Sequence, residues 1–172
     1  MGKKAQIWIE TALYTLIGIV LIGLVLGFVS PKIQESKDRI LLDQTMLSLN
    51  NLNKNIDITS NNVRVFPVQI KKGELFIDSK EDKITFKLDN ILKAPTEEGY
   101  TIENGIVKVL STKGKKYYSV NLTLDYKAIF DIKVNNREEL LRLNSAPAPY
   151  KLSISNLGKI DKLNVIDIKE IS

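Results

Sequence analysis

The residue types that carry most protein chemistry are scarce in this chain, which has 172 residues and neither cysteine nor histidine. The missing histidine removes the commonest general base and metal ligand, and the missing cysteine removes thiolate chemistry and disulfides. Carboxylate chemistry remains, and the acidic pairs are Glu81-Asp82, Glu97-Glu98 and Glu138-Glu139. These pairs stand beside lysines or turn residues without the spacing of a calcium loop, so we interpret them as solvated loop charges. The chain is therefore expected not to be an enzyme, and to have no catalytic residue, no metal and no cofactor.

The positive charge of the chain is mild and dispersed. The formal net charge is +5, and the lysines occur in separate pairs such as Lys71-Lys72 and Lys115-Lys116. A nucleic-acid-binding surface needs a clustered basic stripe, usually with aromatic residues between the charges. No nucleic-acid partner is therefore expected.

The element that must organise the molecule is an apolar stretch near the N-terminus. Between Ile7 and Val29 the only charged residue is Glu10. At about 1.5 Å of rise per residue, this stretch is long enough to cross a bilayer as one helix. It exceeds the roughly 7 to 15 apolar residues of a signal peptide, so it is expected to stay attached. Lysine and arginine flank both of its ends, so charge does not set its orientation.

The residues that follow predict a continuation of the same helix past Pro31. Apolar side chains recur there with spacings near three and four, which indicates an amphipathic helix. The spacing therefore predicts one helix over residues 6–57, with an apolar part at 7–29 and an amphipathic part at 32–56. The amphipathic part is expected to pack on its own domain, with binding to a partner as the alternative. The apolar residues on which this pattern rests are Ile33, Ile40, Leu41, Leu42, Met46, Leu47, Leu49, Leu52 and Ile56.

From Asn62 onward the apolar period changes to two, which is typical of strands. Asn104-Gly105 is a strong signal for a two-residue hairpin turn, and Lys72-Gly73 marks another turn. Seven to nine short strands are expected, and residues 137–143 are expected to form one or two helical turns. The fold class is predicted to be α+β: a long N-terminal helix packed on an all-β, sandwich-like head over residues 58–172.

The first residues carry a resemblance to a known family. The run Lys3-Lys4-Ala5-Gln6-Ile7-Trp8-Ile9-Glu10 resembles the processing site of archaeal type IV pilin-like precursors, which have a class III (prepilin-type) signal peptide. The resemblance covers roughly the first 45 residues. It implies a leader over residues 1–5 and a cut between Ala5 and Gln6, with Lys4 and Ala5 as its determinants. Many archaeal members have glycine before the cut and serine two residues after the glutamine, where this chain has Ala5 and Trp8.

The resemblance implies a structural function for the chain as a pilin or minor pilin of a surface filament, and adhesion, DNA uptake and secretion all stay open as the use of that filament. The subunit would wait in the cytoplasmic membrane as a single-pass protein with its head outside, and would then enter an extracellular filament. The implied partners are a prepilin peptidase, copies of the chain or other pilins, and indirectly an assembly ATPase and a platform protein.

Two features of the apolar stretch fit this function. Cleavage after Ala5 would make Glu10 the fifth residue of the mature chain, where pilins carry a glutamate. We hypothesise that Glu10 pairs with the new α-amino group of Gln6, its own or a neighbour's, and so sets helix register. The alternative is an interfacial glutamate that reaches headgroup water. Gly23 and Gly27 form a small-xxx-small pair that suits close helix packing, although glycine is also tolerated generally in membrane helices.

Asn121-Leu122-Thr123 matches the N-glycosylation sequence, which makes Asn121 a candidate acceptor. Such triplets also arise by chance. The strand alternation places Val120 on one face and Asn121 on the opposite, polar face, where a glycan would have to attach.

Three alternatives to a pilus subunit remain. A subunit of the related archaeal swimming filament, the archaellum, would share the leader and a β-sandwich head. A single-span, membrane-anchored extracellular binding protein would use the same helix only as an anchor. A membrane-tethered enzyme is the third, and the missing histidine and cysteine count against it.

Overall fold

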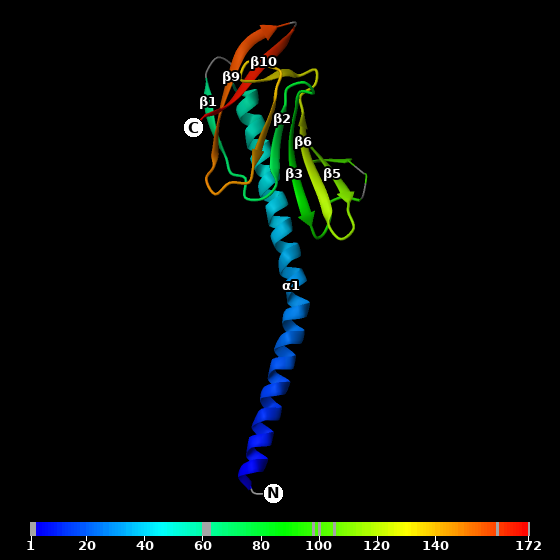
Figure 1. Ribbon diagram of the computed structural model, residues 1–172. Coiled ribbons are helices and arrows are strands. Elements are labelled where there is room, and N and C mark those ends of the chain that lie inside the picture. The colour runs from blue at the N-terminus through cyan, green and yellow to red at the C-terminus, as the bar shows by residue number, and fades with distance from the viewer. Residues whose placement is uncertain are drawn as a thin grey trace. The chain divides into compact units, whose positions relative to one another are not determined.

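The computed structural model of the chain describes residues 3–59, 63–97, 99, 101–104, 106–160 and 162–171 (Figure 1). These residues form one helix, α1 (Lys3–Asp57), and ten strands. The chain divides into two compact units, an N-terminal unit over Met1–Lys37 and a second unit over Asp38–Ser172, called the head below. The predicted single long helix and the α+β fold class are confirmed, and α1 runs through Pro31 without a break.

The head contains two β-sheets. The first sheet has four strands in the order β1-β9-β10-β7, and the second has six in the order β4-β5-β6-β3-β2-β8. Every pairing is antiparallel except that of β10 with β7, which is parallel. The strands are β1 (Arg64–Val68), β2 (Glu74–Asp78), β3 (Lys83–Ile91), β4 (Thr101–Asn104), β5 (Val107–Lys113), β6 (Tyr118–Asp125), β7 (Phe130–Val134), β8 (Leu140–Asn144), β9 (Tyr150–Ile160) and β10 (Leu163–Ile171).

The hairpin predicted at Asn104-Gly105 is present, with its register shifted by one residue. Asn104 pairs with Val107, so β4 and β5 form a hairpin, and Gly105 itself lies outside the described residues. At the other predicted turn, Gly73 has a φ of 88°. A Cβ at this position would collide with the carbonyl oxygen of Lys87, so the turn requires glycine.

Two predictions are wrong: the described residues form ten strands rather than seven to nine, and residues 137–143 form no helical turn. This segment leads into β8, which pairs with β2 along its length. Leu143 is buried in the core, and an Arg142 nitrogen lies 2.6 Å from a carboxylate oxygen of Glu74. The local sequence is compatible with a helix, but pairing with β2 buries an apolar side chain that an isolated helical turn would leave exposed.

The core of the head joins the second half of α1 to both sheets. Leu42, Leu49, Leu52 and Ile56 belong to one buried cluster with side chains from the first sheet, such as Ile154, and from the second. The expected packing of the amphipathic part on its own domain is therefore confirmed for this helix face. The apolar pattern read from the sequence was too wide, because Ile33, Ile40 and Leu47 are exposed.

The buried carboxylate of Asp38 holds the first helical turn of the head in place. Asp38 is only 3% exposed, and its Oδ2 atom accepts a hydrogen bond of 2.9 Å from the backbone nitrogen of Leu92. Its Oδ1 atom lies 3.5 Å from Nζ of Lys72. A buried carboxylate needs such partners, because an uncompensated charge in a protein interior is costly. Asp38 therefore ties α1 to the segment after β3.

Tyr126 makes a second polar link between the helix and the second sheet. Its hydroxyl donates a hydrogen bond of 2.9 Å to Oδ1 of Asn53, and its ring is buried. Burial raises the pKa of Tyr126 above its ordinary value of 10.0, and the nearby carboxylate of Asp57 adds to this effect. The folded head therefore favours the neutral phenol more strongly than the unfolded chain does.

This raised pKa predicts alkaline sensitivity of the head. The stability from neutral Tyr126 is present below a pH of about 10 and is lost as the pH rises further, because the unfolded chain then releases the proton more readily. Urea unfolding of the full chain in detergent, followed by far-UV circular dichroism between pH 8 and 11, is expected to show the loss. Tyr126→Phe is expected to cost about 1 kcal/mol at pH 8, from the lost hydrogen bond, and to flatten the pH dependence. An equally steep alkaline loss in Tyr126→Phe would contradict the assignment to this group.

Candidate functional site: an exposed apolar helix

The N-terminal unit presents large apolar side chains to its surroundings on every side of α1. Across residues 7–29 their exposed fraction runs from 43% at Val29 to 81% at Phe28. The most apolar window of eighteen residues has a mean hydropathy of 2.6, and none of it is buried. The helix is thus long and apolar enough to span a membrane. A helix that is apolar all round needs an apolar environment, either lipid or other protein.

The two threonine hydroxyls within this stretch are satisfied inside the helix itself. The Thr11 hydroxyl donates to the carbonyl oxygen of Ile7 at 2.9 Å, and the Thr15 hydroxyl donates to that of Thr11 at 2.8 Å. Such bonds remove the need for water at these hydroxyls, which is the requirement that a lipid environment imposes.

Glu10 is the only acidic residue in the apolar stretch over residues 7–29, and its side chain is exposed. A charged side chain costs about 3 kcal/mol at the centre of a bilayer and less near the interface. The carboxylate of Glu10 is therefore unfavourable in lipid, and a nearby partner of opposite charge would lower that cost. The predicted partner, the α-amino group of a processed Gln6, is a property of the cleaved chain and stays a prediction.

The two glycines predicted to pack helices lie on open helix surface. A Cβ placed on Gly23 or Gly27 would meet no atom within 4 Å. No contact within the described chain therefore requires glycine at either position. A second helix brought against this surface would approach the backbone more closely there than at its larger neighbours.

The leader residues Lys4, Ala5 and Gln6 belong to the first turns of α1, and their side chains lie outside the described residues. Trp8, the first aromatic residue after them, is 78% exposed. An exposed tryptophan at the end of an apolar helix is typical of the boundary between membrane and water.

Asn121 lies on the predicted face of β6. Val120, Leu122 and Leu124 are buried on the core side, and Asn121 points to the other face, in the middle of the second sheet between β3 and β5. Its side chain is partly buried, and its Oδ1 atom is shielded from solvent without a hydrogen-bond partner. The prediction that Asn121 shares the polar face is confirmed, and its use as a glycan acceptor stays a prediction.

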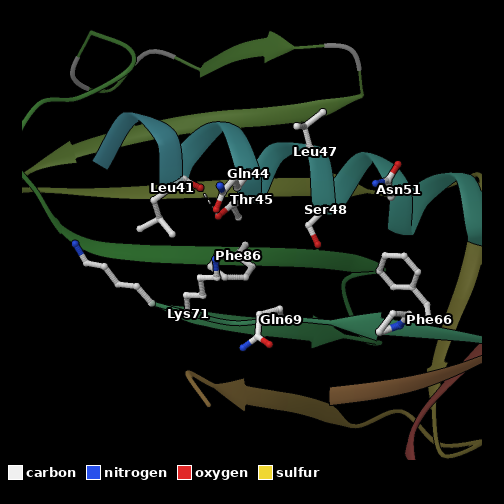
Figure 2. Close-up of a pocket in the computed structure, with 12 residues that line it drawn as sticks. Leu41, Gln44, Thr45, Leu47, Ser48, Asn51, Phe66, Gln69, Lys71 and Phe86 are labelled. Atoms are coloured by element: carbon white, nitrogen blue, oxygen red, sulfur yellow. Dashed lines mark hydrogen bonds between the residues drawn. The ribbon is translucent and has the colours of Figure 1, made fainter. Parts of the chain in front are cut away.

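The head also carries a groove that no sequence pattern predicted. It has a volume of about 420 Å³ and lies between α1, β1 and β3. Figure 2 shows Ser48 pointing from α1 toward the strands, while Leu47 points to the opposite side of the helix. Phe66 and Phe86 form part of the wall opposite α1 (Figure 2). The groove brings together residues far apart in the sequence, so only the tertiary fold creates it.

Exposed apolar residues of α1 within the head were another feature that the sequence reasoning missed. Ile40 and Leu47 are 56% and 63% exposed and stand seven residues apart. Seven residues are close to two helical turns, so both side chains lie on one face. Leu42, Leu49 and Ile56 repeat with the same seven-residue spacing on the buried face, so the spacing alone does not tell the two faces apart.

Comparisons with protein-family models, with curated proteins and with solved structures find no match to this chain. The functional argument therefore rests on the residues and on their arrangement.

Proposed function

We propose that this chain is a structural subunit of a type IV pilus-like surface filament of the archaeal kind, assembled through the apolar part of α1. The observation that carries the proposal is the exposed apolar surface on all sides of residues 7–29, joined to a head that has a buried core of its own. The apolar part of α1 needs cover around its whole circumference.

Two environments can supply that cover in succession. Before assembly, the lipid of the cytoplasmic membrane surrounds the helix, and the hydrogen bonds of the helix itself satisfy its backbone. The chain would then cross the membrane once, with its head outside. After assembly, the helices of neighbouring subunits surround it. The exchange costs little, because lipid tails and apolar side chains are similar in polarity and close packing adds dispersion contacts.

The leader resemblance supports the same proposal. A prepilin peptidase would cut between Ala5 and Gln6, and an assembly ATPase and a platform protein would drive the exchange. The heads would then form the outer surface of the filament, where adhesion takes place.

Two other functions share the same observation. An archaellum-type subunit would use the helix in the same way, and loss of swimming rather than of attachment in a deletion strain would favour it. A membrane-anchored binding protein would keep its helix in lipid, and the head groove between α1, β1 and β3 would then be the natural place for a ligand.

The deciding measurement is the mass and N-terminal sequence of the protein from membranes and from sheared surface material. We expect a chain that begins at Gln6 and is present in the sheared fraction. An Ala5→Leu variant is the matched control, because it removes the small residue before the cut and leaves the rest of α1 unchanged. It should keep its leader and be absent from the sheared fraction. A wild-type chain that keeps residues 1–5 and occurs only in membranes would reject the filament proposal in favour of the anchored protein.

A further inference from the structure

The turn between β7 and β8 holds an asparagine against β10. Asn135 and Asn136 both have positive φ angles, 53° and 60°, and Val134 and Arg137 form a bridge on either side of them. Two successive positive φ angles are the mark of a type I′ turn, which asparagine tolerates well. A backbone hydrogen bond of 3.3 Å from Asn135 to the carbonyl of Ile168 fixes this turn against β10.

Three side chains that could react with one another meet at this point. The carboxylate of Asp167 is fully buried, with its Oδ1 atom 2.6 Å from the backbone nitrogen of Asn136 and its Oδ2 atom 3.0 Å from Nζ of Lys169. In the amide orientation that satisfies both of its ends, Nδ2 of Asn136 donates to Oδ2 of Asp167 at 3.1 Å. The amide oxygen then accepts from Nζ of Lys169 at 3.3 Å.

The arrangement places one carboxylate oxygen between an amine and an amide nitrogen. Oδ2 of Asp167 contacts both Nζ of Lys169 and Nδ2 of Asn136, so it can take a proton from the first and give one to the second. The turn and β10 hold the amine and the amide side by side, so the reaction between them needs no diffusional encounter.

We propose that Lys169 and Asn136 form an intramolecular isopeptide bond, with Asp167 as the proton-transfer group. The site lies wholly within the head and depends on neither leader cleavage nor filament assembly.

The atoms of the step balance without an oxidant, a reductant or a second substrate. Lys169 gives one proton of its ammonium group to Asp167, and its Nζ atom attacks Cγ of Asn136. The Cγ–Nδ2 bond breaks as Asp167 returns the proton to Nδ2, which leaves as ammonia. The nitrogen from lysine loses its second proton to the carboxylate, and that proton can pass to the ammonia. The product is a secondary amide, and the chain has lost one molecule of ammonia. Asn136 is exposed and the Lys169 side chain is 39% exposed, so the ammonia has a path to solvent.

The cross-link would close a covalent loop over residues 136–169, which contains β8 and β9. It would tie the turn after β7, an edge strand of the first sheet, to β10. A covalent loop stabilises a fold chiefly by restricting the unfolded chain, and an amide does so irrespective of redox conditions.

The test is the intact mass of the full chain, purified in detergent and measured fresh and after several days at neutral pH, with peptide mapping after proteolysis. We expect a mass lower than the sequence mass by one ammonia, and a branched peptide joining the segments that contain residues 136 and 169. Lys169→Arg keeps the charge beside Asp167 but removes the nucleophilic amine. Asn136→Gly keeps the type I′ turn but removes the amide. Asp167→Asn removes the proton acceptor. All three are expected at their full sequence masses and with slower migration on a denaturing gel than the compact cross-linked chain.

A folded wild-type chain at its full sequence mass throughout would overturn the proposal and leave the three groups as a clamp that holds the turn. Conversion of Asn136 to aspartate, a gain in mass with no branched peptide, would also overturn it, because water would then have reached the amide before Lys169. Circular dichroism of Lys169→Arg confirms that the comparison is between folded chains.

Discussion

Leu52→Ala is expected to destabilise the head by about 3 kcal/mol, a large share of the roughly 5 to 15 kcal/mol that holds a domain of this kind together. Leu52 is 1% exposed and lies on the face of α1 that joins the buried cluster of both sheets. Removal of its branched end loses the apolar transfer energy and leaves a cavity, because the sheets on either side cannot close completely around the gap.

Leu47→Ala is the matched control, since it makes the same chemical change five residues earlier on the same helix. Leu47 is 63% exposed, so its loss is expected to change the free energy of unfolding by no more than about 0.5 kcal/mol. Urea unfolding of the full chain in detergent, followed by the β signal in far-UV circular dichroism, measures both. Equal effects of the two substitutions would mean that the helix packs on the head through a different face.

Glu10→Gln is expected to abolish surface filaments while the protein still accumulates in the membrane. The substitution preserves size and polarity and removes only the charge that we propose pairs with the α-amino group of a processed subunit. A neutral side chain lowers the cost of residence in lipid, so insertion should not suffer. The readout is the ratio of sheared to membrane-bound protein, together with electron microscopy of the cell surface.

Thr11→Val controls for a change at the neighbouring position of α1. The Thr11 hydroxyl bonds to the carbonyl oxygen of Ile7 within its own helix, so the substitution should leave assembly intact. Filaments of normal number and length in Glu10→Gln would exclude the charge-pairing role and reduce Glu10 to an interfacial residue.

Much of the fold could be predicted because its signals are local. The apolar run from Ile7 to Val29 predicts a helix in an apolar environment. The alternation at Val120, Leu122 and Leu124 predicts a half-buried strand. The Lys72-Gly73 turn was recognisable for the same reason, since a positive φ at this place excludes most residues.

The features that escaped prediction depend on contacts between distant residues. The sequence of β8 is as compatible with helical turns as with a strand, because Leu141 and Leu143 carry no strand signal stronger than a helical one. Only the pairing with β2 decides between them. The exposed face at Ile40 and Leu47 looked as apolar as the buried one, because a sequence does not show which side of a helix the sheets will cover.

The candidate site divides in the same way. Glu10, Gly23 and Gly27 were found from their position in an apolar run, which is a local property. The meeting of Asn136, Asp167 and Lys169 was not, because the parallel pairing of β10 with β7 brings together residues that are some thirty positions apart. Parallel pairing leaves no short turn between its strands and therefore no turn signal to read.

The strand order of the first sheet bears on when the head can fold. Within the described residues, β1 pairs only with β9 and β7 only with β10, so both edges of this sheet depend on one hairpin over residues 150–171 (Figure 1). A ribosome delivers the chain from its N-terminus, so β1 and β7 emerge well before any strand that can hold them. Contacts of such long sequence separation form slowly. The first sheet is therefore expected to close in a single late step, and until then its unpaired strands need protection from other chains.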